Sequence, residues 1–309
     1  MSILNAPYFR DEEAAHSFLE SIIWKNGPVC PHCGVIGKAY KIKANPDKRV
    51  RYGLHKCGAC RKQFTCKIGT VFEHLRIPLH KALQAAYLLC ASKKGISSNQ
   101  LSRTLQISLK AAWFLSHRVR EAMRPGGELA MFGQEGQFVE MDETYIGRKV
   151  GREKMRGVGH KMAVMSLVER GGAVRSFHIN NFDGKTLSDV LEANVSRNAH
   201  LRTDELPTYK QYGHHFASHE TVNHSKDEYV RGDAYTNTLE GYFSIFKRGM
   251  KGIYQHCDEQ HLQRYLAEFD FRYSNRVALD VDDFERTIRA LAGITGKRLT
   301  YKKGVDLAS

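Results

Sequence analysis

Long apolar runs are missing from this sequence of 309 residues. No stretch approaches the ~18 consecutive apolar residues that a helix needs to cross a bilayer. The first 20 residues are acidic and lack the apolar core of a signal peptide. These absences argue against a membrane protein or a secreted protein, and they predict a cytoplasmic location.

Acidic residues are scarce in the first part of the chain. Residues 1–124 contain 21 Lys and Arg against 7 Asp and Glu, a difference of +14. Residues 125–309 contain 26 of each kind, so the whole net charge of +14 resides in the first segment. A segregated positive charge attracts a phosphate backbone through counterion release. We therefore expect the N-terminal part of the chain to bind nucleic acid.

The seven cysteines do not suggest a disulfide framework, because four of them form two CxxC pairs and the expected compartment is reducing. The pairs Cys30–Cys33 and Cys57–Cys60 are separated by 23 residues. Each pair presents two thiolates from one tight turn, and two such turns make the tetrahedral sulfur set that zinc favours. We predict that these four cysteines, Cys30, Cys33, Cys57 and Cys60, bind a structural Zn²⁺ ion.

The residues around these cysteines predict a small strand-and-turn module over residues 28–72. Together with the four ligands, this module predicts a zinc ribbon. His32 and His55 lie close enough in the sequence to replace a ligand, although four thiolates already satisfy the ion. Cys66 and Cys90 are expected to be buried thiols. Basic residues flank the second pair and favour contact with DNA: Lys56, Arg61, Lys62 and Lys67.

Apolar residues at helical spacing predict a helix over residues 9–25 and a helical block over residues 78–124. Within the block, residues 96–105 and 109–123 fit the two helices of a helix-turn-helix, and Ser108 is a suitable cap for the second. The candidate DNA contacts of that second helix are Lys110, His117, Arg118 and Arg120. An ordinary helical hairpin with a solvated basic face is the alternative interpretation.

The pattern changes after residues 125–127, Pro-Gly-Gly, which we interpret as a linker. Four apolar segments then predict strands, with a helix between the third and the fourth and more helices from Thr236 onward. The strand segments are residues 138–147, 161–170, 172–180 and 199–204. This order indicates a multidomain α/β protein in which helices cover a sheet.

We predict four regions along the chain. They are an N-terminal helix and zinc ribbon (1–76), a helix-turn-helix-like DNA-binding region (77–127), a catalytic domain (128–295) and a basic tail (296–309).

Three acidic residues occupy positions that suit metal binding. Asp142 and Asp204 lie at or near the ends of apolar strands, and Glu240 lies in the first turns of a predicted helix. If the strands are neighbours and the helix packs over them, the three carboxylates converge. Such a set can hold two Mg²⁺ or Mn²⁺ ions roughly 3.5–4 Å apart for phosphoryl transfer. Lys247 follows Glu240 by two helical turns on the same face, where it can reach a phosphate.

Residues next to Asp142 and Glu240 are alternative ligands for the predicted metal ions. Glu140 shares the strand face of Asp142 by the period of two, and Glu143 adjoins Asp142, so both acids are rivals. Asn237 lies one turn before Glu240 and is suited to act as a neutral ligand or to orient a water molecule. We rank Glu240 first, because a third negative charge better balances two divalent ions.

Five segments give the chain a resemblance to the IS1595-family (ISXO2-like) insertion-sequence transposases. They are WKNGPVCPHCG, KCGACRKQFTCKIGTVFEHLRIPL, VEMDETYIGRK, TNTLEGYFSIFKRGMKGIY and HLQRYLAEFDFRYSNR, within residues 9–276. The resemblance implies an RNase H-like (DDE-type) catalytic domain. It maps the first two catalytic acids onto Asp142 and Asp204, and the third onto the helix that carries Asn237, Glu240 and Lys247. Members of the family carry Asn or Glu in the third role, so both residues stay candidates.

The resemblance also implies DNA transposition between short terminal inverted repeats. We expect a prokaryotic, nucleoid-associated enzyme that cleaves element ends, joins them to target DNA and assembles as a homo-oligomer on the double-stranded DNA. Besides the residues of the helical block, Arg148, Lys149 and Arg248 are expected to contact phosphates. For the basic loop at residues 148–156, a solvated charged turn is the alternative.

Two other functions compete with transposition. One is a non-catalytic DNA-binding regulator derived from a transposase, which would have no use for carboxylates aimed at phosphates. The other is a nuclease that cleaves DNA without joining it.

Overall fold

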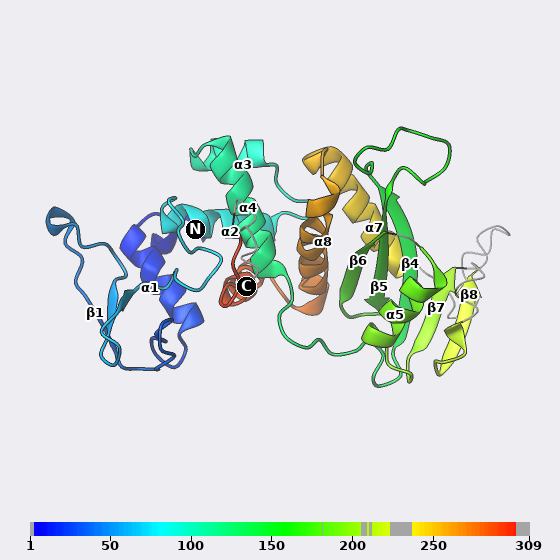
Figure 1. Ribbon diagram of the computed structural model, residues 1–309, viewed down its shortest axis with the longest axis horizontal. Coiled ribbons are helices and arrows are strands. Elements are labelled where there is room, and N and C mark those ends of the chain that lie inside the picture. Colours follow the sequence, from blue (N-terminus) through cyan, green and yellow to red (C-terminus); the bar gives the residue numbers. More distant parts are fainter. Residues whose placement is uncertain (1–2, 181, 205–208, 210–211, 223–236, 301–309) are drawn as a thin grey trace, which may run out of the picture. The chain divides into compact units, whose positions relative to one another are not determined.

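The computed structural model describes residues 3–180, 182–204, 209, 212–222 and 237–300, coloured along the sequence in Figure 1. The chain divides into two compact units. Unit 1 combines Met1–Ser92, Ile96–Arg124 and Asp283–Ser309, and unit 2 combines Lys93–Gly95 with Pro125–Asp282. The predicted linker at residues 125–127 therefore lies where the main part of unit 2 begins.

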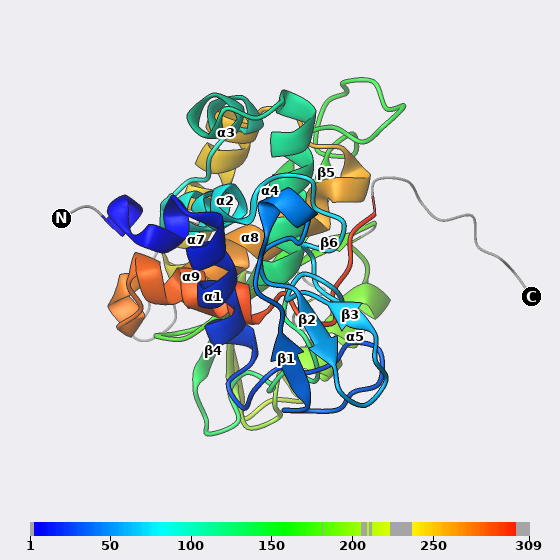
Figure 2. The ribbon, with the colours of Figure 1, turned by 90° about the vertical axis from the view of Figure 1, so that its left-hand side faces the viewer.

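Unit 1 contains a helix beside a small sheet (Figure 2). Helix α1 (Glu12–Ile23) starts at Asp11, whose carboxylate accepts a hydrogen bond from the Ala14 N–H at 2.7 Å. The antiparallel strands β1 (Ala39–Lys41), β2 (His55–Cys57) and β3 (Gln63–Phe64) lie in that order. These strands agree with the strand-and-turn module expected over residues 28–72. Short helical turns occupy Ile3–Asn5, Pro7–Phe9 and Pro46–Lys48.

The rest of unit 1 is helical. Helix α2 spans Leu79–Ala91, α3 spans Ser98–Leu105 and α4 spans Leu109–Met123. Gln106 ends α3 in the left-handed conformation, and the Ser108 hydroxyl caps α4 by accepting from the Ala111 N–H at 3.2 Å. These bounds agree with the expected pair of helices and the cap at Ser108.

A C-terminal helix also belongs to unit 1. Helix α9 (Asp283–Ala292) packs against α2, and the Arg286 Nη1 atom donates a hydrogen bond to the Cys90 carbonyl at 2.9 Å. The sequence predicts a catalytic region that continues to residue 295, whereas the chain from Asp283 onward groups with unit 1. The pairing of α9 with a helix almost 200 residues earlier leaves no local signal in the sequence.

Unit 2 is built on a five-stranded sheet with the order β6-β5-β4-β7-β8. The strands are β4 (Phe138–Ile146), β5 (Met162–Glu169), β6 (Val174–Ile179), β7 (His200–Asp204) and β8 (Ser218–Val222). Strand β5 pairs antiparallel with both β4 and β6, whereas β7 pairs in parallel with both β4 and β8. The first four strands were expected; β8 was not, because its sequence SHETV is polar at four of five positions and lacks an apolar alternation.

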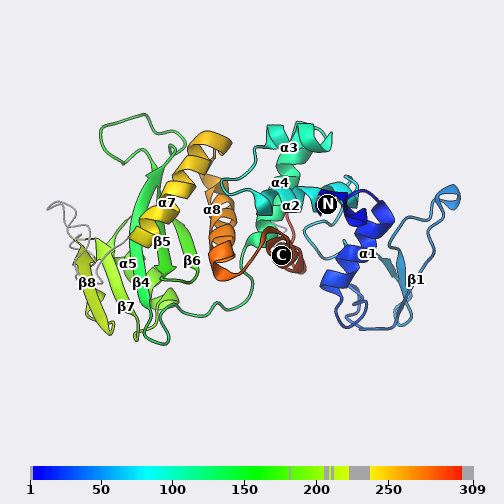
Figure 3. The ribbon, with the colours of Figure 1, turned by 180° about the vertical axis from the view of Figure 1, so that it is seen from behind.

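Helices cover both faces of this sheet (Figures 1 and 3). Helix α5 (Gly184–Asn194) packs on one face, with Val139 and Met141 of β4 in its core. Helices α7 (Asn237–Gly249) and α8 (Glu259–Ser274) pack on the other, with Ile146 of β4 in theirs. A π-helical turn (Met250–Tyr254) follows α7, and a short turn (Val277–Leu279) follows α8. The alternation along β4 thus directs Asp142 toward the face of α7 and α8.

Candidate active site and metal centres

Glu140 fixes the start of helix α7 to strand β4. Its side chain is fully buried, with one carboxylate oxygen 3.0 Å from the Leu239 N–H and the other 2.8 Å from Nε of Arg170. Both oxygens therefore accept bonds from protein donors. Glu140, one of the rival metal ligands of the sequence, has a structural position instead: it caps the helix that carries Asn237 and Glu240.

Asp142 and Asp204 are brought to neighbouring positions by the parallel pairing of β4 and β7. The register places Glu140 opposite Arg202 and Met141 opposite Thr203, so Asp142 and Asp204 are the next residues on the two strands. Both side chains are partly buried. Two residues 62 positions apart in the sequence thus follow directly on the last pair of the two strands. Asp204 is the last residue of β7, as expected, whereas Asp142 lies in the middle of β4 and not at or near its end.

The electrostatics of Asp142 agree with this geometry. The pKa of its carboxyl group is raised to about 7, mainly by burial and then by the negative charges of Glu143 and Asp204. The Glu143 N–H, at 2.7 Å, and the charge of Lys247 act in the opposite direction. Adjacent carboxylates repel one another and hold protons more tightly, unless a cation joins them. The site is therefore suited chemically to a divalent cation with oxygen ligands.

Helix α7 contributes the remaining predicted residues of the active site. Asn237 is its first residue and Glu240 lies in its first turn, and both are exposed. Lys247 is partly buried, with its Nζ atom 5.8 Å from the centre of the Phe243 ring. The positive charge of Lys247 lowers the pKa of Asp142. The choice between Glu240 and Asn237 as the third residue stays a prediction.

A second pair of polar residues, Glu143 and Tyr209, lies on the other face of β4, and no sequence pattern indicates it. The Tyr209 hydroxyl donates a hydrogen bond to Glu143 at 2.7 Å, and the Tyr209 side chain is buried. Burial, together with the charge of Asp204, raises the pKa of Glu143. Glu143 alternates to the face of α5, opposite Asp142. No local signal in the sequence indicates the role of Tyr209, because the two partners are 66 positions apart.

The four predicted zinc ligands converge in unit 1. All four sulfur atoms lie within 4.8 Å of one another, with Cys30 and Cys60 at 3.6 Å and Cys33 and Cys57 at 3.7 Å. A tetrahedral ion with Zn–S bonds of about 2.3 Å requires sulfur separations of about 3.8 Å. The Cys60 N–H contributes most to lowering the pKa of Cys57, to about 7, which favours the thiolate that metals bind. The cluster supports a structural zinc ion.

The alternative histidines do not join this cluster. His32 is exposed and its Nε2 atom lies 3.3 Å from the Gln63 carbonyl. His55 is buried, with its Nδ1 atom 3.2 Å from the Gly53 carbonyl. Cys66 and Cys90 are both buried, as predicted.

The helix-turn-helix exposes only part of its second helix. Lys110 in the first turn of α4 is exposed, but Arg118 is only 7% exposed. The Nη1 atom of Arg118 donates to the carbonyls of Val71 and Glu73 at 2.7 and 2.6 Å. Burial against the segment that carries Val71 and Glu73 therefore replaces the predicted DNA contact of Arg118 with a structural role. The neighbouring candidates His117 and Arg120 are each 1% exposed, so the same correction applies to them.

The basic loop after β4 borders an open hollow of about 690 Å³ in unit 2. Arg148 and Arg152 from the loop and His256 from the segment after the π-helical turn are among its lining residues. Lys149 also lines it and donates to the Asn180 carbonyl at 3.0 Å. Arg248, on α7, is exposed.

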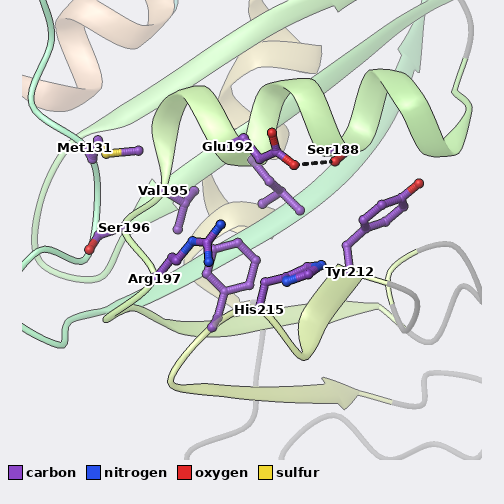
Figure 4. Close-up of a pocket in the computed structure, with 10 residues that line it drawn as sticks. Met131, Ser188, Glu192, Val195, Ser196, Arg197, Tyr212 and His215 are labelled. Atoms are coloured by element: carbon purple, nitrogen blue, oxygen red, sulfur yellow. Dashed lines mark hydrogen bonds between the residues drawn. The ribbon is translucent and has the colours of Figure 1, made fainter.

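Another hollow, of about 550 Å³, lies beside α5 (Figure 4). Leu191 and Val195 provide apolar lining, and Glu192, Arg197 and His215 provide polar groups. It lies on the side of the sheet opposite Asp142, because α5 packs on that side. It is therefore separate from the carboxylate site.

Two family models match the chain. The ISXO2-like transposase domain matches residues 134–274, and the transposase zinc-ribbon domain matches residues 10–63. The chain belongs to the IS1595 transposase family. The first match contains Asp142, Asp204 and Glu240, and the second contains all four clustered cysteines. The resemblance predicted from the five sequence segments is confirmed.

A relative and a solved structure extend the comparison of this transposase-family chain. It is 28% identical over 291 residues to an uncharacterized protein in transposable element ISH50 of Halobacterium salinarum, covering 85% of this chain and 91% of that protein. A crystal structure of a pre-cleavage Mos1 transpososome is 12% identical and covers 68% of this chain and 73% of its own, with a TM-score of 0.28. That score is too low to support an argument about the fold.

Across the described ranges of the chain, no helix combines the length and the apolar character needed to span a bilayer.

Proposed function

We propose that this chain is a DNA transposase that binds the ends of its element, cleaves a DNA strand there and joins the freed 3′-OH to target DNA. The observation that supports the proposal best is the parallel register of β4 and β7, in which Asp142 and Asp204 directly follow the last pair and act on each other's charge. Both lie toward the sheet face that is covered by α7, the helix that carries Glu240 and Lys247. The acids lie within the segment that matches the transposase domain.

The sheet supports an assignment of unit 2 to the RNase H-like folds with a DDE-type site. Three antiparallel strands are followed by two parallel ones, and the first strand of unit 2, β4, becomes the central strand of its sheet. The first acid lies on this central strand and the second on its parallel neighbour. This arrangement places two acids side by side without a loop between them, so the strand backbones define their separation.

We propose that Asp142, Asp204 and Glu240 hold two Mg²⁺ or Mn²⁺ ions, with Asn237 as an assistant or substitute for Glu240. When bound, such a pair of ions activates the attacking oxygen and stabilises the leaving oxygen in phosphoryl transfer. The residues of the chain set the geometry: Glu140 holds the start of α7 against β4, and Lys247 is placed to bind a phosphate beside Asp142.

The proposed DNA contacts are three exposed basic residues, Lys110, Arg148 and Arg248, and the half-buried Lys149. Lys110 lies in the first turn of α4, where a recognition helix meets base edges. Arg148, Lys149 and Arg248 would bind phosphates and set the register of the DNA in unit 2. The hollow of about 690 Å³ beside Arg148 supports the loop as a binding surface.

The test is a cleavage and joining assay on DNA that carries the inverted repeats flanking the gene. With Mg²⁺ we expect cleaved and joined products from the wild type, and a loss of about a hundredfold or more in Asp142→Asn and Asp204→Asn. Asp189→Asn, at an exposed acid of α5, is the matched control and should retain activity. Binding of ends without metal-dependent cleavage would instead indicate a regulator, and cleavage without joining a nuclease.

A further inference from the structure

A second group of potential metal ligands lies in unit 1, apart from the four clustered cysteines. His16, Glu20 and Cys66 each direct one ligand atom to a common point, with the three atoms within 4.8 Å of one another. His16 and Cys66 are 3% and 1% exposed. Two ligands come from successive turns of α1 and the third from the segment after β3.

The distances in this group fit a metal ion with tetrahedral geometry. The Sγ atom of Cys66 lies 3.4 Å from Nδ1 of His16. Bonds of about 2.3 Å to sulfur and about 2.0–2.1 Å to nitrogen place these two atoms about 3.6 Å apart around zinc. Cysteine, histidine and carboxylate are the side chains that bind zinc in proteins.

One buried oxygen distinguishes a metal site from a simple hydrogen bond between the thiol and the imidazole. The Oε1 atom of Glu20 is buried and has no hydrogen-bond partner among the described residues. Its other oxygen accepts from Lys41 at 3.0 Å, and His55 lies 3.8 Å from Oε1, too far for a hydrogen bond. A buried carboxylate oxygen without a partner is costly, and a cation at the common point would satisfy it.

The charges around the group are compatible with a dication bound by two anionic ligands. Besides burial, three positive charges near His16 lower its pKa: Lys67, Lys41 and Arg51. These charges would repel a cation that had no anionic ligands. A zinc ion bound by one thiolate, one carboxylate and a neutral imidazole has no net charge, so this repulsion disappears. Burial and the charge of Glu20 raise the pKa of Cys66 to about 12, against the charges of Lys67 and Lys41, so a metal ion must displace the thiol proton when it binds.

Gly53 sets the position of the imidazole. A Cβ atom at residue 53 would lie 2.2 Å from Nδ1 of His16, and Gly53 has a φ of +65°, which favours glycine. The turn between the first two strands of the ribbon therefore leaves room for the histidine of α1. The ligand group joins α1 to the ribbon at this point.

We propose that His16, Glu20 and Cys66 bind a second zinc ion, with a water molecule as the fourth ligand. This ion ties helix α1 to the zinc ribbon and stabilises the N-terminal module. The site is independent of the catalytic function proposed for unit 2.

The zinc content of the full-length chain tests this proposal. Protein loaded with zinc and passed through a desalting column should contain about two zinc ions per chain by elemental mass spectrometry. Cys66→Ser and His16→Gln should each contain about one, and Cys90→Ser, at a buried thiol outside the group, should contain two. A wild-type content of one, or a content of two in Cys66→Ser, would overturn the proposal.

Cobalt provides a readout that also reports folding. The thiolate-to-cobalt absorbance of the wild type should arise from five thiolates, Cys30, Cys33, Cys57, Cys60 and Cys66. Removal of one thiolate in Cys66→Ser should lower it by about one fifth, whereas Cys90→Ser should leave it unchanged. An unchanged spectrum in Cys66→Ser, with the four-cysteine site still loaded, would contradict the site. Glu20→Gln, which keeps the shape of the side chain, should weaken only the second ion.

Discussion

The zinc ribbon and the carboxylate site show two ways of bringing ligands together. The four cysteines lie within residues 30–60 and are presented by two tight turns, so local spacing determines their cluster. The carboxylates come from a central strand, its parallel neighbour and a helix, spread over residues 142–240. In the ribbon the metal supplies the folding energy, whereas in unit 2 the folded sheet must exist before the acids meet. The zinc ribbon should therefore unfold when its metal is removed, whereas the sheet of unit 2 should stay folded without metal.

Removal of zinc should have the largest effect. Binding of structural zinc contributes roughly 10–16 kcal/mol in small zinc modules, and three strands of two or three residues provide little core of their own. We expect a strong chelator to abolish hydrogen-exchange protection in β1, β2 and β3. Protection in β4, β5 and β7 should persist in the same sample. If the ribbon kept its hydrogen-exchange protection after verified removal of zinc, the claim that zinc folds the ribbon would be contradicted.

Loss of the helix cap in unit 2 should have the next largest effect. Glu140→Ala removes the acceptor of two hydrogen bonds, one from Nε of Arg170 and one from the Leu239 N–H. Removing one member of a buried ion pair destabilises a protein by about 3–5 kcal/mol. Urea denaturation should show this loss. Glu285→Ala, which breaks an ion pair with Arg289 whose side chains are both about half exposed, is the control and should cost under about 1 kcal/mol.

The third position of the carboxylate site can be assigned by a matched pair of variants. We expect Glu240→Gln to lower strand joining about a hundredfold or more, because it removes a charge that balances the metals. Asn237→Ala should lower it by about tenfold or less. The joining assay with end DNA and Mg²⁺ measures both. The reverse order of effects would assign the third role to Asn237.

The pH dependence of metal binding should be the smallest effect. The pKa of Asp142 is about 7, above its ordinary value of 3.8, mainly because the group is buried. Metal must displace this proton, so the affinity for Mg²⁺ should rise about tenfold per pH unit below pH 7 and level off above it. Without metal, the raised pKa means that Asp142 lowers the free energy of unfolding as pH rises from about 4 to 7. Calorimetric titration with Mg²⁺ at pH 6, 7 and 8 measures the slope, and a flat profile would contradict it.

The sequence alone predicted the local features of this molecule, whereas the roles of its acids stay predictions. The zinc ligands and the Ser108 cap follow from spacing within a few residues, and the structure agrees with them. Asp142 and Asp204 were candidates because each lies at or near the end of an apolar run of the sequence. Their adjacency depends on the parallel register of β4 and β7, which no local pattern encodes.

Features that depend on distant partners could not be predicted. Arg118 has the positive charge that a DNA contact requires, so the sequence alone does not distinguish that role from a structural one. Its burial depends on the packing of α4 against the segment around Val71 and Glu73. Glu140 looked like a metal ligand until its two oxygens were found to bind Arg170 and the start of α7. A polar residue on the correct strand face can therefore be either a metal ligand or a structural hydrogen-bonding partner. Its contacts in the folded protein determine which of the two roles it has.

Anomalous scattering from crystals of the DNA-bound chain grown with Mn²⁺ tests the central claim most directly. The account predicts two manganese peaks about 3.5–4 Å apart, with Asp142 and Asp204 both within bonding distance of the pair. A map without manganese at these aspartates, or with ions bound to other residues of unit 2, would contradict it.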